Sequence, residues 1–313
     1  MTTLTGHHHI SMLTKDGKKN HDFYTHILGL RRVKMTVNQD TPTMYHLFYG
    51  DLTGSPGTEL TFFEMPIAGR TTRGTNAITR IGLFVRSYES LHYWKKRFEN
   101  HDVQHGEITT YAGKDALHFE DHEGLRMVLL NLNSNEIPAH WQPFENNTIK
   151  REHTILGMGT TEITVKSLSS TIDLLTTIFG YTICSQSHTQ ALLQHEQGNA
   201  YGEIKLIEQD GPTERPGRGS IHHLALRIES EEALRELNEQ LLAYGLHTSG
   251  VIDRYYFHSL YVRDHNHILF EIATDSPGFT VDSSIEELGT RLDLPPFLEP
   301  RRKEIEAALT PLD

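Results

Sequence analysis

The chain has 313 residues, which is enough for two domains that each bury a substantial core. Its 29 basic and 41 acidic residues give a net charge of −12, which argues against a nucleic-acid or anionic-membrane surface. The N-terminus has no apolar signal-peptide core, no apolar run is long enough to span a membrane, and the single cysteine, Cys184, excludes an internal disulfide. We therefore expect a cytoplasmic protein in which histidines, 21 in number, would supply any metal ligands.

The chain begins with a strand, a helix and three further strands. Segment 7–30, HHHISMLTKDGKKNHDFYTHILGL, is typical of an alternating strand, a short loop, an amphipathic helix and a glycine stop. Strands at 31–37, 44–50 and 59–65 are expected to follow. This order predicts a βαβββ unit over about residues 5–67.

The same order recurs three times, which indicates an internal repeat. Each copy opens with an apolar strand that leads into a helix, and these strands are expected at 78–87, 159–167 and 220–230. The later units are predicted at about 76–133, 153–209 and 217–275. Four such units, in which each helix covers one face of a sheet, predict an α+β fold.

Two segments fall outside the units. A polar, proline-bearing stretch at 135–152 is predicted to link the second unit to the third, which divides the repeats into pairs at 1–134 and 153–278. The tail, 279–313, has a Pro-Pro break and then a short helical pattern. We expect this tail to be a strap rather than a domain.

The opening strands of the first and fourth units carry histidines at equivalent positions. Alternate side chains of a strand face opposite ways, and the apolar stripes are expected beneath the helices. His9 and His223 then face a cavity on the other side, beside the small residues Ser11 and Ala225. The closing strand of the fourth unit places Glu271 among apolar residues, which is costly unless the carboxylate is paired or bound to a cation.

Two imidazoles and one carboxylate with open positions form a facial triad, the ligand set of non-haem Fe(II) enzymes that use oxygen. The second and third units carry Arg80 and Thr160 where the histidines stand, and Val128 where the second unit should have its glutamate. We therefore expect no metal in those units. The first and fourth units must then meet, either within one chain or across a dimer interface.

The repeated βαβββ pattern, with a strand-one histidine and a strand-four glutamate, resembles the vicinal oxygen chelate superfamily, which includes glyoxalase I, bleomycin-resistance proteins and extradiol dioxygenases. The segments IHHLALRI, DRYYFHSLYVRDHNHILFEIATDSPGF and LPPFLEPRR further resemble bacterial hydroquinone-type ring-cleaving dioxygenases. The resemblance implies four modules that form two cup-shaped mixed sheets with helices outside, and Fe(II) bound by His9, His223 and Glu271. Members of this family often dimerise, so a homodimer is a further expectation.

The resemblance also suggests which residues act on the substrate. Tyr261, ten residues before the glutamate, matches the active-site tyrosine and would hydrogen-bond a substrate hydroxyl. The acid–base histidine of extradiol enzymes matches Ile252 instead. His258 is therefore the expected replacement, with His46 and Tyr256 as alternatives or as residues that line the cavity.

These residues predict an Fe(II)-dependent dioxygenase that uses O2 to open the ring of a hydroquinone- or catechol-like aromatic, in the detoxification or degradation of such compounds. Mn(II), Ni(II) or Zn(II) would also suit the ligands. If Glu64 provided a fourth ligand, Ni(II) or Zn(II) would favour a glyoxalase-type isomerase or lyase. A third alternative is a resistance protein that binds an aromatic without catalysis and needs no metal.

Overall fold

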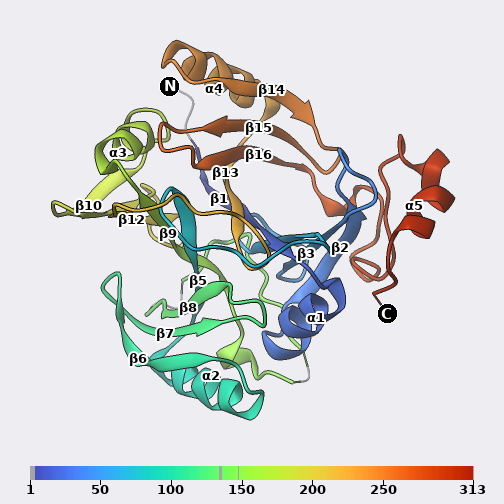
Figure 1. Ribbon diagram of the computed structural model, residues 1–313. Coiled ribbons are helices and arrows are strands. Elements are labelled where there is room, and N and C mark those ends of the chain that lie inside the picture. The colour runs from blue at the N-terminus through green and yellow to red at the C-terminus, as the bar shows by residue number, and fades with distance from the viewer. Residues whose placement is uncertain (1–3, 134–135, 147, 313) are drawn as a thin grey trace.

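The computed structural model describes residues 4–133, 136–146 and 148–312. Their strands form two eight-stranded mixed sheets, and the helices lie on the outside of these sheets (Figure 1). Each sheet is built from two βαβββ units. The predicted α+β fold with four modules and two cup-shaped sheets is confirmed.

The first sheet combines the first and fourth units. Its strands are β1 (Gly6–Thr14), β2 (Arg31–Val37), β3 (Tyr45–Gly50), β4 (Glu59–Glu64), β13 (Ile221–Ile228), β14 (Thr248–Asp253), β15 (Phe257–Arg263) and β16 (Leu269–Pro277), in the order β14-β15-β16-β13-β1-β4-β3-β2. The two units join along β1 and β13, which pair antiparallel with Ser11 opposite His223. The first and fourth units therefore meet within one chain, and no second copy is needed to bring them together.

The second sheet combines the two middle units. Its strands are β5 (Ala77–Val85), β6 (His105–Tyr111), β7 (Lys114–Glu120), β8 (Arg126–Asn131), β9 (Gly157–Val165), β10 (Thr182–Gln186), β11 (Gln190–Gln194) and β12 (Glu203–Glu208), in the order β10-β11-β12-β9-β5-β8-β7-β6. The expected linker, 135–152, includes residues 135 and 147, which lie outside the described residues. The predicted pairs, 1–134 and 153–278, group the units by their place in the chain, whereas the sheets group first with fourth and second with third.

Side-chain caps begin the main outer helices. α2 (Tyr88–Asn100) and α4 (Glu231–Ala243) start after serines whose hydroxyls accept backbone hydrogen bonds, as N-caps do. α1 (Gly17–Asp22) continues into the π-helical turn η1 (Phe23–Ile27), and α3 (Leu168–Thr177) covers the third unit. No helix in the described ranges is long and apolar enough to cross a membrane.

The tail lies along the outer edge of β2. It contains η3 (Phe279–Val281), η4 (Glu299–Arg301) and the predicted short helix, α5 (Arg302–Ala308). Asp293 N donates to Met35 O at 2.9 Å, and Arg32 Nε donates to Gly289 O at 2.8 Å. Since the first of these bonds satisfies a backbone carbonyl at the open edge of β2 and the second holds the tail beside it, the tail covers part of an edge strand.

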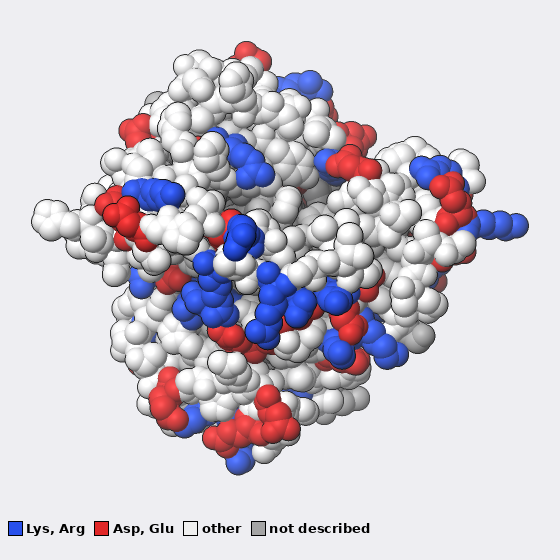
Figure 2. All heavy atoms as spheres, viewed as in Figure 1, with Lys and Arg blue, Asp and Glu red and all other residues white. Residues whose placement is uncertain are grey.

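Two connections cross between the sheets, 65–76 and 209–220. Isolated bridges join them, including Arg70 with Arg218 and Thr72 with Arg215. Figure 2 shows Lys and Arg side chains gathered across the middle of this face, where the connections lie in Figure 1. Positive charge is thus concentrated locally on a chain whose net charge is −12.

In the second sheet, charged side chains form ion pairs near the positions equivalent to the histidines of the first sheet. Arg80 Nε lies 3.7 Å from Glu162 Oε1, and Arg80 Nη1 donates to His118 Nδ1 at 2.6 Å. Tyr111 donates to Glu162 Oε2 at 2.8 Å. Burial, together with the positive charge of Arg80, lowers the pKa of His118 to about 4.

This His118 pKa predicts a loss of stability on acidification. The ordinary histidine pKa is about 6.5, so between pH 6.5 and 4 the unfolded chain binds more protons than the folded chain, and stability falls as the pH falls. We expect the free energy of unfolding to fall by about 1–2 kcal/mol more in the wild type than in His118→Asn between pH 7 and 5. Urea denaturation at both pH values measures this, and an equal fall in the two proteins would contradict it.

Candidate metal centre

Three side chains expected to bind a metal converge at the centre of the first sheet. β1 and β13 present His9 and His223, and β16 presents Glu271 in register with Ala225. Glu271 Oε2 lies 3.2 Å from His9 Nε2 and 2.8 Å from His223 Nε2. The two nitrogens are 3.3 Å apart, and all three side chains are buried.

The spacing of these atoms matches three adjacent ligands of one ion. With metal–ligand distances of about 2.1 Å, two ligands at right angles lie about 3 Å apart. The three observed separations span 2.8 to 3.3 Å. Two imidazoles and one carboxylate on a single face leave the remaining positions open. The residues present therefore fit a divalent ion that also binds exogenous ligands.

The charges of the cluster suit a cation. Burial alone would raise the pKa of Glu271, but His9 and His223 outweigh it and hold that pKa well below its ordinary value. Burial lowers the pKa of His223 despite the adjacent carboxylate. Ser259 Oγ donates to Glu271 Oε1 at 2.5 Å, which fixes one carboxylate oxygen and leaves the other toward the histidines. A charged carboxylate and a neutral imidazole are the protonation states that bind metals.

A second histidine lies behind each of the two histidines that are candidate ligands. His9 Nδ1 is 3.0 Å from His8 Nδ1, and His223 Nδ1 is 2.8 Å from His222 Nδ1. Such a hydrogen bond fixes the orientation of the inner ring and keeps its Nε2 toward the cluster. The same arrangement occurs in both units, so the paired histidines act as matched supports.

A second buried group, His8, His9 and Glu59, also brings three potential ligand atoms together. Burial raises the pKa of Glu59 well above its ordinary value, and its Oε2 has no hydrogen-bond partner in the part of the chain that the structure describes. Neither His8 nor Glu59 lines the adjacent cavity, whereas His9, His223 and Glu271 all do. A substrate could therefore reach an ion only at the latter cluster.

A cavity of about 490 Å³ opens onto the three side chains. This volume is ample for a single aromatic ring. Much of its wall is apolar, and the apolar lining consists of Leu13, Val37, Met44, Phe48, Phe63, Met65 and Phe257. A planar apolar ring with a few hydroxyl groups fits such a wall.

Three polar side chains face this cavity beside the cluster. Tyr261 lines it, and the Arg254 guanidinium lies 5.5 Å from the Tyr261 ring centroid. Arg254 Nη2 also pairs with Asp40 Oδ2 at 3.0 Å. His46 Nε2 is 3.0 Å from Thr61 Oγ1, and burial, reinforced by the nearby histidines, lowers the pKa of His46 well below its ordinary value. His46 is therefore neutral at neutral pH.

The expected acid–base residue, His258, does not face the cavity. Phe257 lines the cavity and Ser259 contacts the candidate carboxylate ligand, whereas His258 Nε2 lies 3.6 Å from Glu231 Oε2 at the start of α4. The alternation of β15 thus turns His258 toward the helix side of the sheet. This placement does not favour the predicted role of His258 in proton transfer.

Glu64 is also placed away from the cluster. Its Oε1 accepts a hydrogen bond from Gly17 N at 2.7 Å, where α1 begins. Thr61 pairs with Ser11 in the first unit as Glu271 pairs with Ala225 in the fourth. The position equivalent to Glu271 is therefore Thr61, not Glu64. Glu64 neither belongs to the described clusters of potential ligands nor lines the cavity, so the structure does not favour its predicted role as a fourth ligand.

Sequence reasoning missed several residues of the site. His222, which sequence reasoning did not single out, lines the cavity and supports His223. The repeated His-His doublet was the available signal for His8 and His222. Ser259 could have been found from its place two residues before Tyr261, on the same face of the strand. Tyr256, in contrast, lines the cavity as the alternative assignment expected.

Comparison with known proteins agrees with this fold. Residues 6–129 and 157–272 match the family described as the Glyoxalase/Bleomycin resistance protein/Dioxygenase superfamily. The chain is 48% identical, over 99% of both chains, to the Bacillus subtilis (strain 168) protein named "Putative ring-cleaving dioxygenase MhqA". It is 26% identical to the "Chlorohydroquinone/hydroquinone 1,2-dioxygenase" of Sphingobium indicum, over 96% of this chain and 95% of the other. A crystal structure of a "putative dioxygenase" from B. subtilis subsp. subtilis str. 168 superposes with a TM-score of 0.92 at 31% identity, covering 100% of this chain and 99% of that one.

The chain therefore belongs to the Glyoxalase/Bleomycin resistance protein/Dioxygenase superfamily. The resemblance inferred from the histidine and glutamate pattern is confirmed.

The two glutamates offer a matched test of the metal centre. We expect Glu271→Gln to lose bound Fe(II), because it removes the only charge of the ligand set, whereas Glu64→Gln keeps a stoichiometric amount. Ser259→Ala should weaken Fe(II) binding by about tenfold, since it frees the carboxylate from its support. Metal analysis after anaerobic loading and dialysis measures all three. Loss of iron from Glu64→Gln with retention in Glu271→Gln would refute the assignment.

Proposed function

We propose that this protein is an Fe(II)-dependent ring-cleaving dioxygenase that acts on a dihydroxylated aromatic, hydroquinone- or catechol-like. The observation that carries the proposal is the triad of His9, His223 and Glu271, with ligand atoms 2.8 to 3.3 Å apart, at the wall of a largely apolar cavity. The names of the relatives from B. subtilis and S. indicum support ring cleavage and a hydroquinone-type substrate.

The ligand set favours iron and oxygen chemistry. Fe(II) held by two neutral imidazoles and one carboxylate keeps a net positive charge and would supply the means to activate O2 beside an aromatic hydroxyl. His9, His223 and Glu271 would occupy one face of the ion, so that substrate and O2 could be positioned together. Mn(II), Ni(II) and Zn(II) fit the same donors less specifically.

The chain's own residues would orient the ring. Tyr261 can donate a hydrogen bond to a substrate oxygen, and burial raises its pKa above the ordinary value, so it stays protonated. The Arg254 guanidinium beside it would balance the negative charge of a phenolate. The band of Lys and Arg on the face shown in Figure 2 would favour the approach of such an anion.

His46 is the proton-transfer group that the geometry favours in place of His258. It lines the cavity, and its ring centroid lies 4.0 Å from that of Phe48 and 4.2 Å from that of Phe63. Its low pKa keeps the imidazole neutral, in the form that has a nitrogen lone pair, and makes it a weak base. Thr61, hydrogen-bonded to Nε2, orients the ring toward the cavity.

The alternatives lose their structural support. The glyoxalase-type lyase was expected from a fourth ligand, Glu64, which binds the start of α1 instead. A binding protein without catalysis does not require three buried side chains arranged as ligands of one ion. Removal of the metal separates it from the enzyme, since a binder would keep its affinity for the aromatic.

The activity test uses anaerobically loaded protein. We expect the Fe(II) form to consume O2 in equal amount with hydroquinone or a catechol, and a chelator to abolish the uptake. An oxygen electrode, with mass analysis of the ring-opened product, measures this. Activity with Zn(II) in the absence of O2, or no uptake across the panel with iron bound, would refute the proposed reaction.

Two histidines on different faces test the proton-transfer assignment. We expect His46→Asn to lower kcat by about 10²- to 10⁴-fold with iron content unchanged, because the cavity loses its neutral base. His258→Asn is the control, and its kcat should stay within about twofold, because His258 faces Glu231 outside the cavity. Steady-state kinetics of both loaded variants gives the answer; the reverse order of effects would overturn the assignment.

A further inference from the structure

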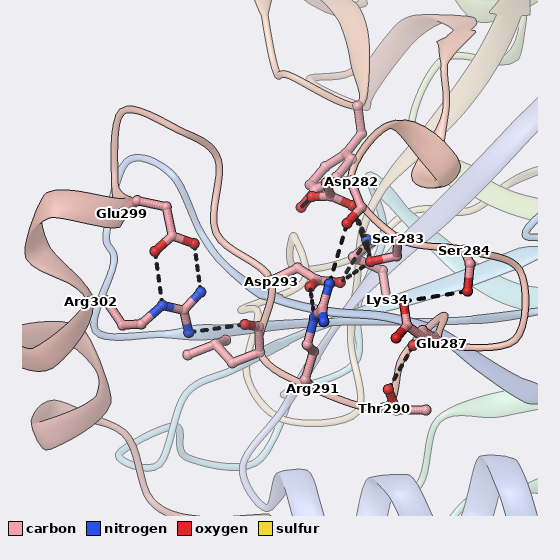
Figure 3. A network of polar contacts seen from close by, with 12 residues as sticks. Lys34, Asp282, Ser283, Ser284, Glu287, Thr290, Arg291, Asp293, Glu299 and Arg302 are labelled. Carbon is pink, nitrogen blue, oxygen red and sulfur yellow. Dashed lines mark hydrogen bonds and ion pairs between the residues drawn. The ribbon is translucent and has the colours of Figure 1, made fainter.

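A fully buried lysine ties the tail to the first unit. Lys34, on β2, is 0% exposed, and its Nζ lies 2.7 Å from Asp282 Oδ1 and 2.7 Å from Asp293 Oδ2. Ser283 Oγ donates to the same Asp293 oxygen at 3.0 Å, and Arg291 Nε pairs with the other at 3.1 Å. Figure 3 shows Lys34 enclosed by these tail side chains. A buried charge of this kind requires partners held in fixed positions.

The Asp282 carboxylate also binds the fourth unit. Tyr256 donates to Asp282 Oδ2 at 2.9 Å, while Lys34 holds Oδ1. The Lys34 ammonium lies 4.9 Å from the centroid of the Tyr256 ring, which adds a cation–π contact. Asp282, Lys34 and Tyr256 thus form a closed triangle between the tail and two different units.

Both partners of Asp282 lie on segments that form walls of the cavity. β2 continues from Lys34 into residues 36–40, which line one wall. Tyr256 lines the opposite wall, together with Arg254 and Phe257. The walls also touch directly, since Gln39 Nε2 donates to Arg254 O at 2.7 Å and Arg254 Nη2 pairs with Asp40 Oδ2 at 3.0 Å. Away from these contacts, Asp282 joins them.

We propose that Asp282 is a positioning residue for the substrate cavity, so that the C-terminal tail acts as a clasp that sets the distance between the wall of the first unit and the wall of the fourth. The clasp fixes how tightly an aromatic ring is held against the candidate metal centre. This inference rests on the proposed function only for the identity of the bound ring. The contacts of Asp282 with Lys34 and Tyr256 do not depend on that function.

A double-mutant cycle tests the clasp. Tyr256→Phe keeps the ring and removes only the hydroxyl that reaches Asp282, and Asp282→Asn removes the charge from the other side. With hydroquinone as the probe and iron-loaded enzyme, each single variant should raise KM about tenfold with kcat within about twofold. The double variant should be no worse than the stronger single variant, because both remove one interaction.

The control lies in the same tail. Glu299 pairs with Arg302 at 2.6 Å, apart from Lys34 and Asp282, as Figure 3 shows. Glu299→Gln should leave KM and kcat unchanged. A general loosening of the tail would move all of these variants alike, so equal effects in Glu299→Gln and Asp282→Asn would overturn the proposal.

A second readout does not depend on catalysis. Hydrogen exchange of segments 35–44 and 253–257 should speed up in Tyr256→Phe and Asp282→Asn, and stay at the wild-type rate in Glu299→Gln. If the wild type fails to consume O2 while this pattern holds, the proposed reaction is wrong and the clasp stands. Should Asp282→Asn not fold, Tyr256→Phe alone decides, and unchanged KM and exchange in that variant would refute the clasp.

Discussion

The pairing of β1 with β13 is the constraint on which the first sheet depends. It joins two strands more than two hundred residues apart and sets Ser11 opposite His223, so that His9 and His223 reach the same side of the sheet. β16 then lies parallel to β13 and brings Glu271 beside both rings. A shift of one residue along either strand would turn its histidine toward the helices, because side chains alternate along a strand. The register of a single strand pair therefore decides whether the three donor atoms meet.

Both sheets bury charged side chains, and each compensates the buried charge in a different way. In the first, a buried carboxylate faces two histidines and Ser259, with the fourth side of the cluster left to the cavity. In the second, Arg80 and Glu162 pair with each other, and Thr79 and Tyr111 donate hydrogen bonds to Glu162. A buried charge must be compensated, either by protein groups or by a bound ion. The two sheets thus share one fold, with an open ligand set in the first and an internal ion pair in the second.

Sequence periodicity predicted the four units because each opening strand is apolar and each is followed by a helix with a buried face. It predicted the convergence of His9, His223 and Glu271 because the same strand positions recur in two units. It failed for strands β6, β10 and β14, whose exposed, polar residues show no apolar alternation. It could have placed His258 away from the cavity, because His258 lies an odd number of residues from Tyr261 on the same strand, whereas the position of Glu64 depends on its tertiary partner Gly17. Irregularities in β1 and β15 have no sequence signature of their own.

A comparison of the outer strands shows how the tail affects the cavity. Each unit ends its sheet with its second strand, where β6 and β10 remain largely exposed and β14 is partly exposed. β2 occupies the same position but is mostly buried, because the tail pairs with it and encloses Lys34. β2 leads directly into residues 36–40, which line the cavity next to the candidate metal centre, and β14 at the opposite edge of the sheet leads into Arg254, which also lines it. A strand that forms a cavity wall must be held in place. The tail therefore stabilises an edge whose position affects how a ring is bound.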